Sequence, residues 1–412
     1  MADLAGHVDL LFRVGHLDVR AAPEERQLRF SAMTNGDNCP PPHSPGQFGA
    51  LATSATTREA PAAAATPSGA CDVLFRMLGG YVLAQCIAVA AMLGIADALA
   101  DGPRPVGWLA AATGSDERSL ERLLRGLANA GVFAETAPAE FALTPLSQHL
   151  RRDAEPSLHG LAVLTGTVLY QAWGGLASAV RSGGTAFEQV HGVPFYEYLA
   201  ERPDARDAAN RWMEASGQQW ALAAGLEGAV DWSSVRTVVD VGGGTGTLLA
   251  GLLSRHEHLR GILFDRPETV AEGAHHAQPL RGRLELVGGD FFERVPAGGD
   301  VLLLARVLFN WDDEPARALL RACRRAAGGG ATLLVLEPVR KSTRAPDAGT
   351  GMDLVNLVLT GGRVRTLPEL EQLVAGAGFD LVGARPLAPP WLALEARAPS
   401  AAAVDLHRRI TP

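Results

Sequence analysis

A glycine-rich turn after a strand-like run is the clearest chemical signal in the sequence. The mostly apolar run 237–241 leads into 242–246 (GGGTG), and a helix is expected over 247–253. A turn of this kind lets a ligand approach the backbone closely and presents unpaired N–H groups to it. We therefore expect a nucleotide-like ligand here. Three glycines would contact it: Gly242, Gly244 and Gly246.

The spacing of the glycines separates two classes of ligand. A dinucleotide fingerprint, G-x-G-x-x-G, needs glycine at its sixth position, and Thr247 stands there. Asp240 instead makes the pattern Asp-x-Gly-x-Gly-x-Gly, with a carboxylate just before the turn. This pattern suits a cationic sulfonium nucleotide with an amino-acid tail, S-adenosylmethionine (SAM), better than a pyrophosphate. A nicotinamide-dependent oxidoreductase is the rival interpretation, and calorimetric titration with NAD and with SAM would separate the two.

Acids also end the next two strand-like runs. Asp265 follows the turn by roughly twenty residues, where a carboxylate can hold both ribose hydroxyls. Asp290 ends the third run, and its carboxylate or neighbouring backbone can bond the adenine amine. Phe291 would then pack on the face of the adenine ring. Three strand ends at one edge of a sheet therefore predict a SAM site.

The elements that must position these residues alternate between strands and helices. Seven runs have strand character: 237–241, 261–264, 284–287, 301–304, 332–336, 379–384 and 391–396. A helix expected over 312–327 begins with acids and ends with arginines, which matches the helix dipole. Thr366 and Glu369 form a capping box that opens another helix. This alternation predicts a doubly wound, mostly parallel, Rossmann-like domain over 231–399.

The preceding part of the chain has a different pattern. Apolar residues at helical spacing follow a capping signal at 115–118, and two short strands are expected at 132–133 and 140–143. This pattern predicts a winged-helix domain over 71–165 that is otherwise all-helical. A helical linker over 166–230 would cover the active site. The predicted fold class is therefore α/β, with a helical winged-helix domain in front of a Rossmann-like domain.

Composition limits the partners. The 412 residues suggest two domains plus extra segments, and the net charge of −8 argues against nucleic-acid binding. The candidate DNA-recognition helix within the winged helix balances its three arginines with acids, which makes it a poor phosphate binder. The four cysteines and the pair His256 and His258 have no metal-ligand spacing, so no metal is expected. No run of about eighteen apolar residues was found, and a cytoplasmic protein is expected.

The two ends of the chain carry weaker signals. Residues 1–70 are rich in small and polar residues after position 39, which indicates a disordered segment. The alternative is that translation begins at Met33, and an intact-mass measurement would decide this. Residues 400–412 are expected to form a tail.

Several motifs resemble those of the small-molecule O-methyltransferases, which include plant caffeate-type and bacterial polyketide-tailoring enzymes. The resemblance covers about residues 72–398. Its strings are 240–246, 289–292, 306–314, 336–338 and 361–366, with 194–199 and 211–213 upstream. It implies a winged-helix domain used for homodimerisation and a Rossmann-like domain that binds SAM. The active site would lie between the two domains.

The sequence departs from this family at the catalytic positions. Most members carry a histidine base two residues before Trp311, where this chain has Phe309. A second family carboxylate is replaced by Val364, which leaves Glu337 as the one match to the usual trio. Phenylalanine cannot accept a proton, so deprotonation of a phenol by this residue is excluded. The neighbouring Asn310 is the residue expected to orient a substrate hydroxyl or carbonyl, or else to cap the following helix.

The resemblance assigns provisional roles to the remaining residues. Asn310 and Glu337 are the catalytic candidates, and Ala305 stands at a cofactor-binding position where relatives often carry a polar residue. The substrate would contact four residues: Met213, Phe309, Asn310 and Trp311. A substitute base could come from His159 or His191 in the helical stretch.

Two chemistries remain compatible with these residues. SAM could methylate a hydroxyl of an aromatic or polyketide-type metabolite, with proximity and alignment supplying about 7–11 kcal/mol of the barrier reduction. The combination of an apolar residue, Asn310 and Trp311 also resembles the anthracycline-tailoring branch. That branch includes SAM-binding enzymes that do not methylate, so hydroxylation, decarboxylation or rearrangement is the alternative.

Overall fold

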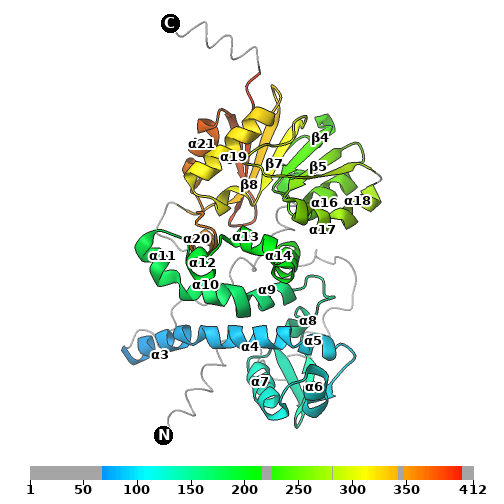
Figure 1. Cartoon of the computed structure of the whole chain (residues 1–412), viewed down its shortest axis with the longest axis vertical. Coiled ribbons are helices and arrows are strands. Elements are labelled where there is room, and N and C mark those ends of the chain that lie inside the picture. The colour runs from blue at the N-terminus through cyan, green and yellow to red at the C-terminus, as the bar shows by residue number, and fades with distance from the viewer. Residues whose placement is uncertain (1–66, 216–224, 281, 342–347, 401–412) are drawn as a thin grey trace, which may run out of the picture. The chain divides into compact units, whose positions relative to one another are not determined.

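The computed structural model describes residues 67–400, except 216–224, 281 and 342–347. The described residues divide into two compact units, 67–167 and 168–400 (Figure 1). The expectations for 1–66, including a start at Met33, and for 401–412 lie outside the described residues.

The first unit is a set of helices with a small sheet. Its helices are α3 (Pro67–Leu78), α4 (Gly80–Met92), α5 (Ile95–Ala98), α6 (Val106–Thr113), α7 (Glu117–Asn129), α8 (Pro145–Gln148) and α9 (His159–Leu164). Asp116 caps α7 by accepting a hydrogen bond from the Ser119 N–H (2.9 Å), as its sequence indicates. The predicted wing strands are β2 (Phe133–Ala137) and β3 (Glu140–Leu143). A third strand, β1 (Arg104–Pro105), was not predicted, because two residues give no periodic signal.

One helical stretch of the first unit is rich in apolar residues, although it is not an unbroken apolar run. Ala70–Met92 is long and apolar enough to cross a membrane, judged by length and composition alone. The sequence prediction required an unbroken apolar run, and Asp72, Arg76 and Gln85 interrupt this one. Much of it is exposed: Leu74 and Leu78 are 58% and 68% accessible.

The second unit contains a seven-stranded sheet in the order β6-β5-β4-β7-β8-β10-β9. The strands are β4 (Thr237–Val241), β5 (Arg260–Asp265), β6 (Leu284–Gly288), β7 (Val301–Ala305), β8 (Thr332–Pro338), β9 (Asp380–Pro386) and β10 (Trp391–Arg397). All seven predicted strands are confirmed to within two residues at either end. The first five are parallel, whereas β10 is antiparallel to β8 and β9. The link from β9 to β10 is too short for a helical crossover and forces a hairpin.

Helices cover both faces of this sheet (Figure 1). α19 (Asp313–Ala326) and α21 (Leu367–Gly376) pack in the apolar core on one face. α16 (Thr247–Arg255) packs in the core on the other, and α17 (Pro267–Glu272) and α18 (Ala274–Ala277) lie along β5 and β6. The predicted capping box is present, because Thr366 and Glu369 bond each other's backbone N–H groups.

The helical stretch after residue 167 belongs to the second unit. It comprises α10 (Tyr170–Gly174), α11 (Leu176–Ser182), α12 (Ala186–His191), α13 (Phe195–Glu201) and α14 (Pro203–Ala215). The first three pack against α20 (Ala348–Leu359). α13 and α14 are tied to the segment after β5: Arg266 Nη1 donates to the Tyr196 carbonyl (2.9 Å), and Arg206 Nε donates to Glu272 Oε1 (2.6 Å).

Candidate active site

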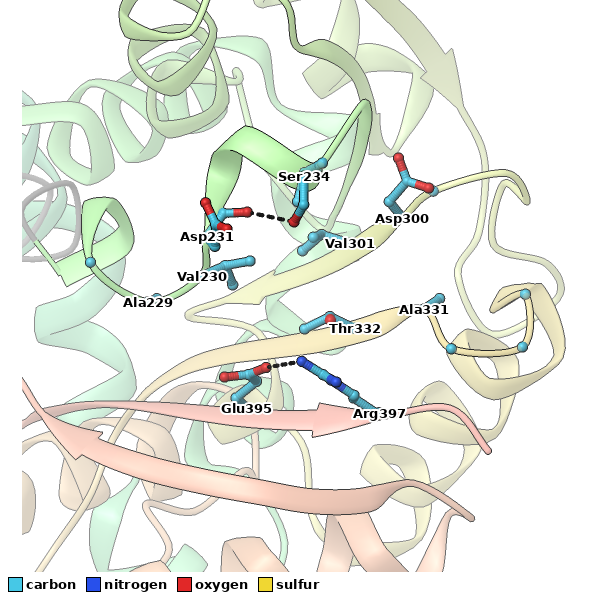
Figure 2. A pocket seen from close by; sticks show the side chains of 16 residues that line it. Ala229, Val230, Asp231, Ser234, Asp300, Val301, Ala331, Thr332, Glu395 and Arg397 are labelled. Atoms are coloured by element: carbon cyan, nitrogen blue, oxygen red, sulfur yellow. Dashed lines mark hydrogen bonds and ion pairs between the residues drawn. The ribbon is translucent and has the colours of Figure 1, made fainter. Parts of the chain in front are cut away.

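A hollow at the amino ends of the central strands is not the predicted site (Figure 2). Its lining includes Asp231, Asp300, Glu395 and Arg397. Asp300 Oδ2 accepts hydrogen bonds from two backbone N–H groups where β4 begins, so its carboxylate has a structural partner. The glycine turn lies at the opposite, carboxyl edge of the same strands, which is where ligands bind in sheets of this type.

The glycine turn has the backbone that the sequence predicts. Gly242, Gly244 and Gly246 have φ of 72°, 63° and 87°, which other residues rarely adopt. A Cβ on Gly243 would lie 2.6 Å from the Asp240 side chain, whereas one on Gly244 would meet nothing within 4 Å. The turn therefore packs against Asp240 on one side and is open on the other. This shape is a cradle for a ligand.

Asp240 provides a direct test of whether a cationic cofactor fits the cradle. It is 1% exposed, and neither carboxylate oxygen has a hydrogen-bond partner within the described part of the chain. Burial raises its pKa to about 7, and the nearby charge of Asp265 adds to this shift. A buried carboxylate without a partner is costly unless a ligand supplies a compensating charge. The α-ammonium group of SAM is such a partner, so Asp240 fits SAM.

Asp265 ties the second strand to the glycine turn. The Gly244 N–H donates to its Oδ2 (2.8 Å), and the Arg266 N–H donates to its Oδ1 (2.7 Å). Burial raises its pKa, and the two backbone hydrogen bonds oppose that shift. The carboxylate thus fixes the turn. Its predicted contact with the ribose hydroxyls stays a prediction.

Asp290 and Phe291 lie at the next strand end. Asp290 is exposed, and its Oδ1 accepts a hydrogen bond from the Phe292 N–H (2.8 Å). Phe291 is close to the glycine turn, because a Cβ on Gly242 would lie 3.6 Å from its ring. Its ring also meets that of Trp311 edge to face, with centroids 5.9 Å apart. The structure therefore brings Phe291, the glycine turn and Trp311 together.

Glu337 organises the turn that follows β7. Its Oε1 accepts hydrogen bonds from the N–H groups of Val307 (2.8 Å) and Leu308 (2.9 Å), and its Oε2 accepts one from Phe309 (2.9 Å). Burial raises its pKa to about 7, against the three hydrogen bonds. Both oxygens are engaged by backbone. These contacts hold the backbone of the turn, and the predicted catalytic role of Glu337 stays a prediction.

Asn310 and Phe309 are held in the same turn. Asn310 Nδ2 donates to the Arg306 carbonyl (3.0 Å), so the side chain closes the turn and does not cap the following helix. Asn356 Nδ2 donates to the Phe309 carbonyl (2.7 Å). A Cβ on Gly362 would clash with the backbone of Phe309 and Asn310, so this segment passes directly over the turn.

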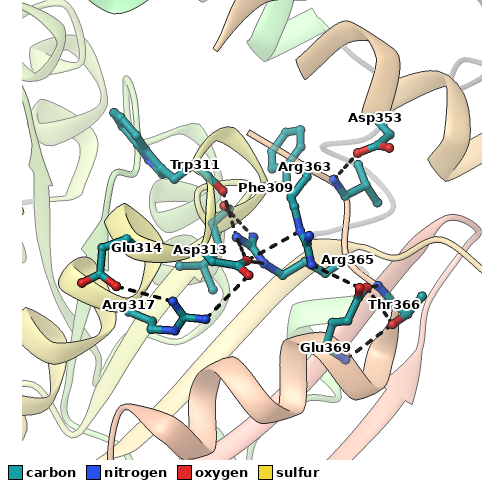
Figure 3. Close-up of polar contacts among 12 residues, drawn as sticks. Phe309, Trp311, Asp313, Glu314, Arg317, Asp353, Arg363, Arg365, Thr366 and Glu369 are labelled. Atoms are coloured by element: carbon teal, nitrogen blue, oxygen red, sulfur yellow. Dashed lines mark hydrogen bonds and ion pairs between the residues drawn. The ribbon is translucent and has the colours of Figure 1, made fainter. Parts of the chain in front are cut away.

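Arg365 is a positioning residue that the sequence prediction missed (Figure 3). Its buried guanidinium donates to the carbonyls of Leu308 (3.1 Å) and Trp311 (2.9 Å) and pairs with Asp313 Oδ1 (2.9 Å). Its only sequence signal was membership of the family string 361–366. The neighbouring Val364 is fully buried, so the position of the lost family carboxylate is apolar core.

Four further residues complete the carboxyl edge. Ala305 ends β7, and Met213 lies on α14, where its carbonyl accepts a hydrogen bond from Arg306 Nη1 (3.3 Å). Tyr196 on α13 stacks on Trp311 with ring centroids 6.0 Å apart. Tyr196 and Arg306 were not predicted as site residues. The substrate-binding roles of Met213 and Trp311 stay predictions.

The two candidate substitute bases both contact backbone carbonyls. His159 lies in the first unit, with its Nε2 3.2 Å from the Ala91 carbonyl. His191 Nε2 lies 3.2 Å from the Val168 carbonyl, and its ring packs against Phe187. Among the described residues, no group of three or more potential ligands could hold a metal ion.

Comparison with known proteins gives the class of protein that this fold and site define. Family models for an O-methyltransferase domain and an O-methyltransferase dimerisation domain match residues 173–380 and 75–153. A phenazine O-methyltransferase from Lysobacter antibioticus is 40% identical over 328 residues, which are 79% of this chain and 96% of that protein. Aclacinomycin 10-hydroxylase from Streptomyces purpurascens is 36% identical over 322 residues, which are 76% and 86% of the two chains.

A solved structure adds the cofactor. An O-methyltransferase from neocarzinostatin biosynthesis, in complex with SAM and 2-hydroxy-5-methyl naphthoic acid, matches with a TM-score of 0.68 at 34% identity. The match covers 76% of this chain and 95% of that one. The chain belongs to the O-methyltransferase family, and its cofactor is SAM.

Proposed function

We propose that this protein transfers the methyl group of SAM to a hydroxyl of an aromatic or polyketide-type metabolite. The observation that carries the proposal is the buried carboxylate of Asp240, which no described residue bonds, beneath an open glycine turn. Relatives support the substrate class: their names include a 3-amino-4-hydroxybenzoate 4-O-methyltransferase and a dihydroxynaphthoate 7-O-methyltransferase. When bound, SAM supplies an electrophilic methyl group.

The proposed cofactor contacts follow from the three strand ends. Asp240 would face the ammonium group, and the turn would cradle the amino-acid tail. Asp265 would hold the ribose, because it stands beside the turn at the end of β5. Asp290 or its backbone would bond the adenine amine, and the Phe291 ring would cover the adenine. Ala305 would leave room beside the cofactor.

The acceptor would lie against the turn after β7. Met213, Phe309 and Trp311 offer apolar contacts, and the Asn310 side-chain oxygen remains for a substrate hydroxyl, because its amide nitrogen bonds backbone. We assign Glu337 a positioning role, since backbone occupies both oxygens. Catalysis would then rest on placement of the acceptor oxygen against the methyl group rather than on proton removal by a side chain.

Replacing Phe309 with histidine is expected to keep methyl transfer within about tenfold of the wild-type rate, a difference that corresponds to about 1.4 kcal/mol in the barrier. The new imidazole would lack an orienting carboxylate, because Val364 is buried and Glu337 is bound to backbone. Initial rates across pH would check this. A loss of activity beyond a hundredfold, with SAM binding intact, would contradict catalysis by placement.

The second candidate is a SAM-binding reaction without methyl transfer. It is favoured by one observation, the hydroxylase at 36% identity among the relatives. The decisive test is incubation with methyl-labelled SAM and a panel of hydroxybenzoates, hydroxynaphthoates and hydroxyphenazines. Labelled product together with S-adenosylhomocysteine (SAH) supports methylation. Tight SAM binding without SAH release from any acceptor would favour the second candidate.

We also propose that the protein is a homodimer that buries the exposed face of α3 and α4. Leu74 and Leu78 lie one helical turn apart on that face, within or beside the dimerisation match. Changing both to glutamate is expected to produce monomers or aggregates in light scattering. The control is Arg118→Glu with Arg122→Glu, the same spacing on exposed positions of α7. An unchanged dimer would refute this interface, and sedimentation of the wild type with lipid vesicles would indicate a membrane role instead.

A further inference from the structure

The end of α17 lies directly against the glycine turn. Gly273 joins α17 to α18, and a Cβ on it would clash with the Thr245 carbonyl group and lie 3.2 Å from the Thr245 Cα. The two segments therefore meet backbone against backbone, with no side chain between them. A restraint on the turn 242–246 is passed directly to the end of α17, because backbone packed this closely cannot shift on one side alone.

Glu272, the last residue of α17, reaches from this contact to α14. Its Oε1 accepts a hydrogen bond from Arg206 Nε (2.6 Å), and its Oε2 accepts one from Asn210 Nδ2. Arg206 and Asn210 lie one helical turn apart on the same face of α14. The Arg206 side chain is 16% exposed and Asn210 is 6% exposed, so solvent screens these contacts less than it screens a surface ion pair. Both oxygens of the carboxylate are thus bound by one helix.

Two arginines extend the connection to α13. Arg206 Nη1 donates to the carbonyls of Leu199 (3.3 Å) and Ala200 (3.0 Å), near the end of α13. Arg266 acts near the start of α13: its N–H donates to Asp265 Oδ1 (2.7 Å), and its Nη1 donates to the Tyr196 carbonyl (2.9 Å). The segment 265–273 therefore holds α13 near both ends and holds α14 through Glu272.

The helices held in this way carry residues on the acceptor side of the site. Tyr196 on α13 stacks on Trp311, and Met213 lies on α14. The other side of the segment 265–273 meets the glycine turn through Gly273 and through the bond from the Gly244 N–H to Asp265 (2.8 Å). One short segment thus joins the cofactor turn to both helices.

We infer that Glu272 is a positioning residue that transmits cofactor binding at the glycine turn to α13 and α14. The inference rests on the proposed function and adds a coupling between the cofactor and the acceptor. A cofactor in the turn restrains the end of α17, and Glu272 passes this restraint to α14. The acceptor then meets helices that are already ordered and binds more tightly. The coupling is reciprocal, so the acceptor tightens cofactor binding by the same factor.

The first test measures hydrogen exchange without turnover, with SAH as the probe of the cofactor site. Amides of 195–201 and 203–210 report on α13 and on the part of α14 that Glu272 holds. In the wild type, SAH is expected to slow their exchange by about fivefold or more, in addition to slowing exchange in the glycine turn.

Glu272→Gln is expected to remove most of this effect of SAH. The new amide group faces Arg206 or Asn210, which are both donors, so at least one hydrogen bond is lost. SAH should then slow exchange in α13 and α14 by less than about twofold, while the glycine turn responds as in the wild type. A purely structural role would speed exchange with and without SAH and leave the effect of SAH itself unchanged.

A rescue and a control complete the series. Glu272→Gln combined with Asn210→Asp exchanges the donor and the acceptor and keeps a carboxylate near Arg206, so the effect of SAH should return. Glu257→Gln makes the same chemical change on an exposed acid in the loop after α16 and should match the wild type.

The second test follows methyl transfer to the panel of hydroxybenzoates, hydroxynaphthoates and hydroxyphenazines. Glu272→Gln should raise the KM of the acceptor by about fivefold, because the acceptor must then order α13 and α14 without help from the cofactor. The kcat and the Kd of SAH should stay close to the wild-type values, and the double variant should recover the KM.

The outcomes separate this inference from the proposed function. If SAH slows exchange in the helices of Glu272→Gln as much as in the wild type, α13 and α14 respond without Glu272 and the inference is wrong. A loss of SAH affinity of about tenfold in this variant would place Glu272 in the cofactor site and also overturn it. If exchange behaves as expected but no acceptor is methylated, the proposed function fails and the link from the turn to the helices stands. Failure of the wild type to bind SAH would overturn both.

Discussion

Asp240→Asn is expected to stabilise the ligand-free protein and to weaken its binding of SAM at the same time. Asp240 is buried, its carboxylate has no hydrogen-bond partner among the described residues, and its pKa is raised from 3.8 to about 7. Asparagine has nearly the same shape and no charge to bury. It cannot offer a carboxylate to the ammonium group of SAM, and the loss of one charged hydrogen bond costs about 1.5–3 kcal/mol, or roughly 10- to 100-fold in affinity.

The sign of the pH dependence follows from the raised pKa of Asp240. Above its ordinary pKa the unfolded chain releases the proton, whereas the folded protein keeps it until about pH 7. The contribution of Asp240 to the free energy of unfolding is therefore complete below about pH 4. It is lost as the pH rises toward 7, by up to roughly 4 kcal/mol. Asp265, whose pKa is also raised, contributes with the same sign. SAM binding has the opposite dependence and weakens about tenfold for each pH unit below 7.

Thermal unfolding and calorimetric titration between pH 5 and 9 would measure both effects. The variant should unfold at a higher temperature than the wild type above pH 7 without SAM, and this advantage should shrink when SAM is added. The matched control is Asp231→Asn, an exposed acid that binds backbone beside the distal hollow. A variant that binds SAM like the wild type at pH 8 would show that Asp240 does not face the ammonium group.

Glu337→Ala is expected to destabilise the protein strongly and to abolish activity through the loss of one turn. Three N–H groups, those of Val307, Leu308 and Phe309, would lose their acceptor. Each buried N–H left unpaired costs about 1–3 kcal/mol, so the free energy of unfolding should fall by at least about 3 kcal/mol. The left-handed backbone of Arg306 would also lose support, because the three N–H groups that follow it would no longer be hydrogen-bonded to Glu337.

Denaturant unfolding and methyl-transfer rates on the same samples would separate anchoring from catalysis. Glu337→Gln keeps one carbonyl oxygen and should lose less stability than the alanine variant. Glu314→Gln, on a side chain that is 72% exposed, should leave the free energy of unfolding close to that of the wild type. If Glu337→Gln unfolds like the wild type but is inactive at every pH, Glu337 has a chemical role and the anchoring account fails.

The three positions that the family resemblance marks as catalytic hold Phe309, Val364 and Glu337 in this chain. Phe309 and Val364 replace the base and one carboxylate, and Val364 is part of the apolar core. The position that keeps its acid, Glu337, is the one that carries the backbone of the turn. The positioning role that we propose for Glu337 is enough to account for an acid at this position.

The sequence alone determined the order and type of the elements in the second unit. Apolar runs of strand length alternated with helices that carried their own caps, so all seven strands and the capping box at Thr366 could be read from local pattern. It also determined the glycine turn and its acids, because positive φ and close backbone approach demand particular residues. The O-methyltransferase class was predicted from the resemblance of several strings, including 306–314 and 361–366, to that family.

Only the tertiary structure decided which buried polar side-chain atoms have hydrogen-bond partners. Nothing in the local sequence distinguishes Asp240 from Glu337. Within the described ranges the Asp240 carboxylate has no partner, whereas the Glu337 carboxylate accepts hydrogen bonds from N–H groups about thirty residues earlier in the chain. Arg306, Tyr196 and Arg365 likewise act through contacts between strands and helices far apart in sequence. Hydrogen bonding and burial depend on packing between elements that are far apart in the chain, so they cannot be predicted from the spacing of residues.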